Sequence, residues 1–177
     1  MKAFKPRSPP RGGGAGWRGV VPMNPPAWVF GARLMFELVN ATTMPVGKNY
    51  RPSTYLYAKA KRGEGEGVFR KGLRLKDSVI VKRISFDGDN WELVAEVPSE
   101  SAPSTRYTVA IYMPLDFECS CPHGQHRFNP CKHVHAAVLK LLEISGADTR
   151  DPVLWHYIYE GLNKLAYHKA RMQRNLV

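Results

Sequence analysis

Long apolar runs are absent from this chain of 177 residues. No stretch approaches the roughly 20 apolar residues that a membrane-spanning helix needs. The first residues are basic but lack the apolar segment typical of a secretory signal. We therefore expect no membrane partner and a cytoplasmic location.

Cysteine is also scarce. The chain has three cysteines, which cannot all pair with one another, and all of them lie between residues 119 and 131. In a reducing compartment, such a cluster indicates a metal site rather than a disulfide framework.

Acidic residues are missing from the first 26 positions. Residues 1–83 contain 17 Lys and Arg against 4 Asp and Glu, whereas residues 84–177 contain 9 against 11. The excess positive charge therefore belongs to the first half, which favours an acidic polymer such as nucleic acid as partner. The alternative is a basic surface that serves only solubility.

The sequence also shows no residue pattern typical of a catalytic site. Asp87 and Asp89 are typical turn residues, and the carboxylate of Glu118 is expected to be exposed beside Cys119. The segment Gly14–Gly19 matches G-x-G-x-x-G, but no strand precedes it and no periodic helix follows, so we predict no nucleotide site there. We expect neither an enzyme nor a small-molecule substrate.

The composition divides the chain into four regions. Residues 1–26 form a basic, Pro/Gly-rich flexible arm, and residues 27–67 a basic and aromatic region. Residues 68–146 are predicted to form a compact domain, followed by a C-terminal amphipathic helix within residues 147–177. The apolar segment 27–39 has helical spacing but is also compatible with a buried strand.

The compact domain is predicted to be α+β. Two β-branched runs, Val79–Phe86 and Trp91–Val97, flank a turn-forming segment and predict a hairpin. Tyr107–Tyr112 adds a third strand, which makes a small antiparallel meander. A helix follows over Val134–Leu142 and ends near Gly146.

The last helix has its own signals. Asp151 is a good N-cap, and Pro152 suits the first helical position. The apolar stripe of this helix consists of Leu154, Ile158, Leu162 and Leu165. Its basic C-terminal end matches the helix dipole or contacts phosphate, and the sequence does not decide between the two.

Cys119, Cys121, Cys131 and His133 form the candidate metal site. The pairs Cys-x-Cys and Cys-x-His supply three thiolates and one imidazole, a donor set for a tetrahedral Zn²⁺. We place Cys119 and Cys121 on an extension of the third strand, and the second pair in the turn that enters the following helix. Lys132 lies beside the site to offset its negative charge.

Other interpretations of the cluster stay open. His123, His126 or His135 can replace His133 as the fourth ligand, and a single nucleophilic cysteine is conceivable. Four protein ligands would fill the coordination shell, which makes the zinc structural.

The motif resembles the SWIM zinc finger, C-x-C-x(n)-C-x-H, over roughly residues 68–145. The resemblance implies a small β-sheet and helix organised by zinc, in DNA-binding or protein-interaction settings. The resemblance rests on Tyr107-Thr108-Val109, Cys119-Ser120-Cys121-Pro122, Pro130-Cys131-Lys132-His133-Val134, Ala136-Ala137 and the strand pair after Gly72.

We expect the protein to bind DNA, or structured RNA in a ribonucleoprotein assembly such as the ribosome. Basic side chains would contact phosphates while tyrosines and Phe69 stack on exposed bases. The candidate contacts are Lys5, Arg7, Arg11, Arg18, Lys48, Arg51, Tyr55, Tyr57, Lys59, Lys61, Arg62, Arg70 and Lys71.

The alternative function is a protein adaptor, similar to the recombination regulators among SWIM proteins. It would dock through the finger and the last helix. Exposure of Trp155 and Tyr159 would favour it, and packing of both against the core would not.

Overall fold

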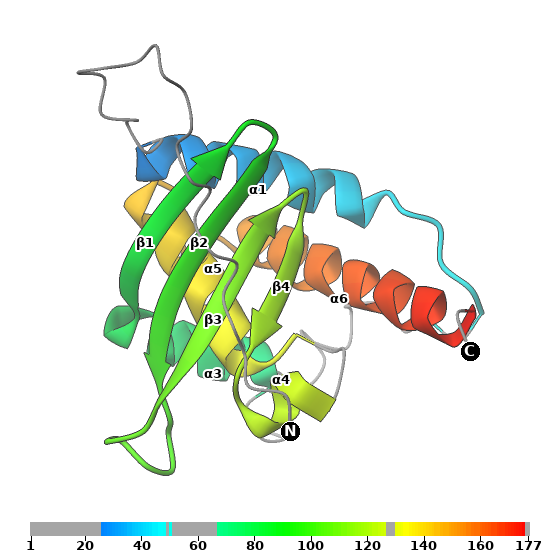
Figure 1. Cartoon of the computed structure of the whole chain (residues 1–177). Coiled ribbons are helices and arrows are strands. Elements are labelled where there is room, and N and C mark those ends of the chain that lie inside the picture. The colour runs from blue at the N-terminus through cyan, green and yellow to red at the C-terminus, as the bar shows by residue number, and fades with distance from the viewer. Residues whose placement is uncertain (1–25, 49, 51–66, 127–129, 176–177) are drawn as a thin grey trace, which may run out of the picture.

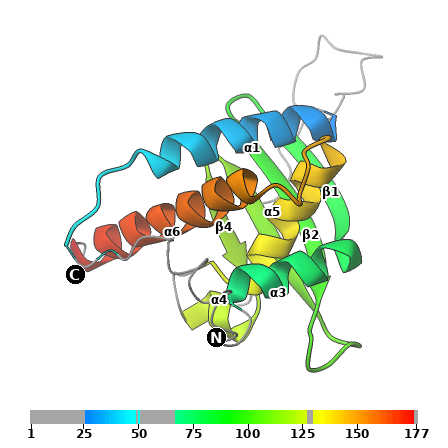
Figure 2. The ribbon, with the colours of Figure 1, turned by 180° about the vertical axis from the view of Figure 1, so that it is seen from behind.

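The computed structural model describes residues 26–48, 50, 67–126 and 130–175. A four-stranded antiparallel sheet forms one layer, and helices cover one of its faces (Figure 1). Figure 2, seen from behind, shows these helices in front of the sheet. The α+β class predicted from the sequence is confirmed.

The sheet has the strand order β1-β2-β3-β4. β1 (Ile80–Asp87) and β2 (Asn90–Pro98) form the predicted hairpin, which closes through Gly88 at φ 56°. β3 (Arg106–Met113) is the predicted third strand. The fourth strand, β4 (Asp116–Cys119), was not predicted: the chain reverses after Met113 and pairs back on β3. Placing Cys119 and Cys121 on an extension of the third strand was therefore wrong.

The larger helices follow the sequence periodicity. α1 (Ala27–Thr42) resolves the ambiguity over residues 27–39 in favour of a helix. α5 (Lys132–Ile144) and α6 (Pro152–Asn175) confirm the two predicted helices, and the Asp151 carboxylate accepts a hydrogen bond from the Val153 N–H at 2.9 Å. In the part of the chain that is described, no helix has the length and apolar character needed to cross a membrane.

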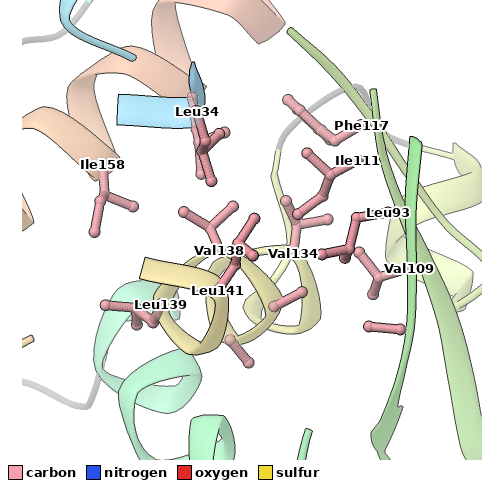
Figure 3. Close-up of a cluster of buried hydrophobic side chains, with 14 of the residues drawn as sticks. Leu34, Leu93, Val109, Ile111, Phe117, Val134, Val138, Leu139, Leu141 and Ile158 are labelled. Carbon is pink, nitrogen blue, oxygen red and sulfur yellow. The ribbon is translucent and has the colours of Figure 1, made fainter. Parts of the chain in front are cut away.

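α5 is the centre of the core. Its residues Val134, Val138 and Leu141 recur with helical spacing and are at most 1% exposed. Figure 3 shows α5 lying between the sheet, represented by Leu93 and Ile111, and the other helices. Leu34 of α1 and Ile158 of α6 belong to the same buried cluster, so both helices pack on the core that carries the cysteines.

One helix at the edge of this core was missed. α3 (Val68–Leu75) continues into a short 3₁₀ turn, η1 (Lys76–Ser78), which leads into β1. Phe69, predicted to stack on bases, is instead 1% exposed and packs against His135 and Trp155. Basic residues along α3 obscured its apolar side in the sequence.

Gly72 allows α3 to approach α5 closely. A Cβ atom at this position would lie 2.7 Å from the His135 Cβ and 3.0 Å from the Lys132 carbonyl oxygen. The first distance is shorter than real Cβ contacts, and the second is tight against backbone that cannot turn away. Glycine is therefore required sterically, at the turn of α5 that carries His133.

Gly72→Val is expected to destabilise the fold by about 1–3 kcal/mol, because the added atoms force α3 away from α5. Urea unfolding of the zinc-loaded protein measures this change. Arg70→Ala, an exposed substitution on the same helix, is the control and should stay within about 0.5 kcal/mol of wild type. Equal stability of the glycine variant would contradict the close packing of the two helices.

Candidate metal centre

The four candidate ligands come from two places in the fold. Cys119 is the last residue of β4, and Cys121 follows two residues later, before the short helix α4 (Pro122–His126). Cys131 is the N-cap of α5, and His133 lies in its first turn. The second placement is the one predicted from the sequence.

The geometry of the cluster suits one zinc ion. The four ligand atoms lie within 4.8 Å of one another, and all four residues are buried. The His133 Nδ1 atom is 3.9 Å from the Cys119 Sγ and 3.7 Å from the Cys131 Sγ. A tetrahedral Zn²⁺ with ordinary bond lengths separates such sulfur and nitrogen atoms by about 3.5 Å, so small adjustments close the shell.

The first cysteine pair is fixed by the neighbouring strand. The Ser120 N–H donates to the Thr108 carbonyl at 3.0 Å, and the Ser120 hydroxyl accepts from the Thr108 N–H at 2.9 Å. The ladder between β3 and β4 thus continues past Cys119. Since side chains alternate along an extended segment, Cys119 and Cys121 then point to the same side.

Gly124 is a further residue of the site that the sequence analysis did not single out. Its backbone N–H donates to the Cys121 Sγ at 3.2 Å, and a Cβ atom there would lie 2.5 Å from the Cys119 carbonyl oxygen. Hydrogen bonds of this kind orient and stabilise metal-bound thiolates. A glycine three residues after the second cysteine was the available signal.

Hydrogen bonds distribute negative charge unevenly among the three sulfurs. The pKa of Cys121 is lowered because its sulfur accepts hydrogen bonds from the thiols of Cys119 and Cys131. The pKa of Cys119 is raised by its hydrogen bond to Cys121, and burial raises it further. Zn²⁺ binding would reverse this second shift, because a coordinated thiol loses its proton.

His133, and not another histidine, completes the cluster. His135 is 1% exposed, and its Nδ1–H donates to the Cys131 carbonyl at 2.9 Å. Burial lowers the pKa of His135 to about 4, so this imidazole is neutral at physiological pH. His123 is exposed, and the side chain of His126 lies outside the described residues.

The donor set fits a structural zinc ion. Three thiolates and one imidazole are preferred zinc ligands, and together they leave no open position. The Nδ1 atom of His133 faces the sulfurs, and its ring packs 4.8 Å from the ring of Tyr107. The Nε2 atom is buried and has no hydrogen-bond partner among the described residues.

The predicted nucleic-acid contacts are only partly described. Lys48 and Arg70 are exposed, and Lys71 is half-buried. Lys132, predicted to balance the charge of the metal site, lies beside the ligands and pairs with Glu100 at 2.9 Å. The remaining candidates lie outside the described residues: Lys5, Arg7, Arg11, Arg18, Arg51, Tyr55, Tyr57, Lys59, Lys61 and Arg62.

Comparison with known families gives a result that agrees with this geometry. Residues 107–142 match the model of the SWIM zinc finger. This segment runs from the second residue of β3 to α5 and contains all four candidate ligands. No curated protein and no solved structure matched the chain. The match and the cluster together support one zinc ion.

His133→Gln is expected to weaken zinc binding by more than about 100-fold, because loss of a second-shell partner alone costs 10–100-fold. Competition with a chelating dye measures the affinity, and elemental analysis gives the stoichiometry. Thermal unfolding should shift down in parallel, since metal binding is coupled to folding.

The matched control for the ligand variant is His123→Gln, which changes an exposed histidine ten residues away along the chain. It should retain one zinc ion per chain with wild-type affinity. Zinc loss in the His123 variant together with retention in the His133 variant would exchange the roles that the geometry assigns to them.

Proposed function

We propose that this SWIM zinc-finger protein is a non-enzymatic nucleic-acid-binding protein whose finger is the structural module. Its partner is DNA, or structured RNA in a ribonucleoprotein assembly. The contacts come mainly from the basic N-terminal half. The zinc site stabilises the fold against which α3, which carries some of these contacts, is packed.

The observation that carries the proposal is the basic side of α3. Arg70 and Arg74 are exposed, and Lys71 lies between them in the sequence. The opposite side of the helix buries Phe69 and approaches α5 at Gly72. A helix anchored in this way presents its cations at fixed positions, which favours contacts to successive phosphates.

The distribution of charge supports the same partner. The excess of Lys and Arg is confined to residues 1–83, where it reaches 17 against 4 acids. The finger itself is nearly neutral, so nucleic acid would be attracted to the basic half, of which α3 is a described part.

The metal centre argues for a structural rather than a catalytic role. A catalytic zinc site keeps an open position for water or substrate, whereas four protein ligands close the shell. Asp87 and Asp89 lie at the β1–β2 turn, as predicted, and the Glu118 carboxylate accepts a hydrogen bond from the Tyr112 hydroxyl at 3.0 Å. These carboxylates form no acid–base pair.

Binding to nucleic acid is expected to weaken steeply with salt, because each phosphate contact releases counterions. The Arg70→Gln, Arg74→Gln double variant should lower the slope of log affinity against log salt by about 1 to 2. Fluorescence anisotropy between 50 and 300 mM salt measures the slope with duplex DNA, single-stranded DNA and structured RNA.

The matched control carries the same loss of two charges elsewhere. Lys82 on β1 and Arg150 before α6 are both exposed and lie off α3, and each pairs with a neighbouring carboxylate, as Arg74 does with Glu100. The Lys82→Gln, Arg150→Gln variant should keep the wild-type slope. A flat salt dependence of the wild-type protein would refute the proposal for all three polymers.

A protein partner is the second candidate, and one observation favours it. Trp28 and Phe36 on α1 are 62% and 61% exposed. The form predicted from the sequence is not favoured, because Trp155 and Tyr159 pack against the core. A protein partner whose binding persists after nuclease treatment and in high salt, and is lost in the Trp28→Ser variant, would support this function.

A further inference from the structure

A cavity lies directly beside the metal centre. Its volume is about 570 Å³, within the range of small-molecule and nucleotide sites. The lining comes from the start of α3, the β2–β3 loop, the beginning of β3 and both zinc-binding segments. Figures 1 and 2 both show α3, α4 and the β2–β3 loop at the same end of the molecule.

Part of the cavity lining is polar and cationic. Lys71 and Lys132 line it together with the hydroxyl groups of Ser99 and Ser101. Glu100 lies between these serines in the sequence but does not line the cavity, and its carboxylate pairs with Lys132 at 2.9 Å and with Arg74 at 3.3 Å. The cations Lys71, Lys132 and Arg74 outnumber this one carboxylate, which favours an anionic ligand.

Another part of the lining is formed by rings and apolar atoms. Tyr107, Pro122, His123 and Val68 line it. Tyr107 is half-buried against the His133 ring, which fixes its orientation, and His123 is exposed. A flat aromatic group entering from solvent would find the tyrosine ring already held in place, at a small loss of conformational entropy.

We propose that this cavity binds one unstacked nucleotide of a single strand, with the base against Tyr107 and the phosphate between Lys71 and Lys132. Aromatic rings and cations, which this lining contains together, are the two elements that single-strand sites combine. A base inside a duplex is not available to enter, so the cavity would make the protein prefer single strands. This inference rests on the proposed nucleic-acid binding.

The test fills the cavity without changing charge. Ser101 is an exposed cavity residue in the β2–β3 loop, and Ser104 is an exposed residue of the same loop that does not line the cavity. Ser101→Trp and the control Ser104→Trp are compared with wild type. Anisotropy gives the affinity for a single-stranded octanucleotide and for a duplex of the same length and sequence, and elemental analysis confirms that each variant holds zinc.

Wild type is expected to prefer the single strand, and Ser101→Trp should lower the single-strand affinity at least about tenfold, since a stacked base typically contributes this much. Its affinity for the duplex and the salt slope of duplex binding should not change, and the Ser104 variant should behave as wild type. In photo-crosslinking, an oligonucleotide containing 5-bromouracil should attach to Tyr107 or His123.

Failure of this inference is distinguishable from failure of the proposed function. Salt-dependent binding that is equal for both polymers, or unaffected by Ser101→Trp, would overturn the nucleotide site and leave the general function intact. In a further outcome, an acidic peptide displaces the single strand from wild type and also fails to bind the Ser101→Trp variant. That result would overturn the nucleotide site in favour of a peptide site. Absence of any nucleic-acid binding would remove both.

Discussion

Coordination of one zinc ion by residues from the end of a strand and the beginning of a helix is the constraint on which this structure depends. Cys119 and Cys121 follow β4, and Cys131 and His133 begin α5. Three sulfurs buried together would otherwise compete for protons and for scarce hydrogen-bond donors. A metal ion binds all three as thiolates and fixes the position of α5 relative to the sheet.

The position of α5 in turn determines the rest of the core. α5 lies between the sheet and the other helices (Figure 3). Gly72 lets α3 pack closely on α5, at the turn of α5 that follows the ligands. The basic residues of α3 and Lys132 therefore belong to helices whose positions depend on the metal centre. The binding surface and the cavity proposed above are consequences of the same coordination.

Much of this arrangement follows from local sequence signals. Alternation and the Asp87–Asn90 turn predicted the hairpin, and helical periodicity with Gly146 and Asp151 at the boundaries predicted α5 and the start of α6. The spacing of cysteines and His133 predicted the metal cluster, because few other arrangements use three clustered thiols.

The parts that were missed depend on contacts distant in sequence. β4 is four residues long, too short for an alternation pattern, and only its pairing with β3 defines it. α3 is defined by burial of Phe69 and by the fit of Gly72 against α5. The cavity likewise requires the folded chain, since its lining comes from four separate segments.

The most direct test of the central claim is X-ray absorption at the zinc edge of the purified, reduced protein. We expect one zinc ion per chain, with three sulfur ligands at about 2.3 Å and one nitrogen ligand at about 2.0 Å, and no water oxygen in the shell. A protein without stoichiometric zinc would contradict it. So would a zinc ion that keeps an oxygen ligand in place of one of the cysteines.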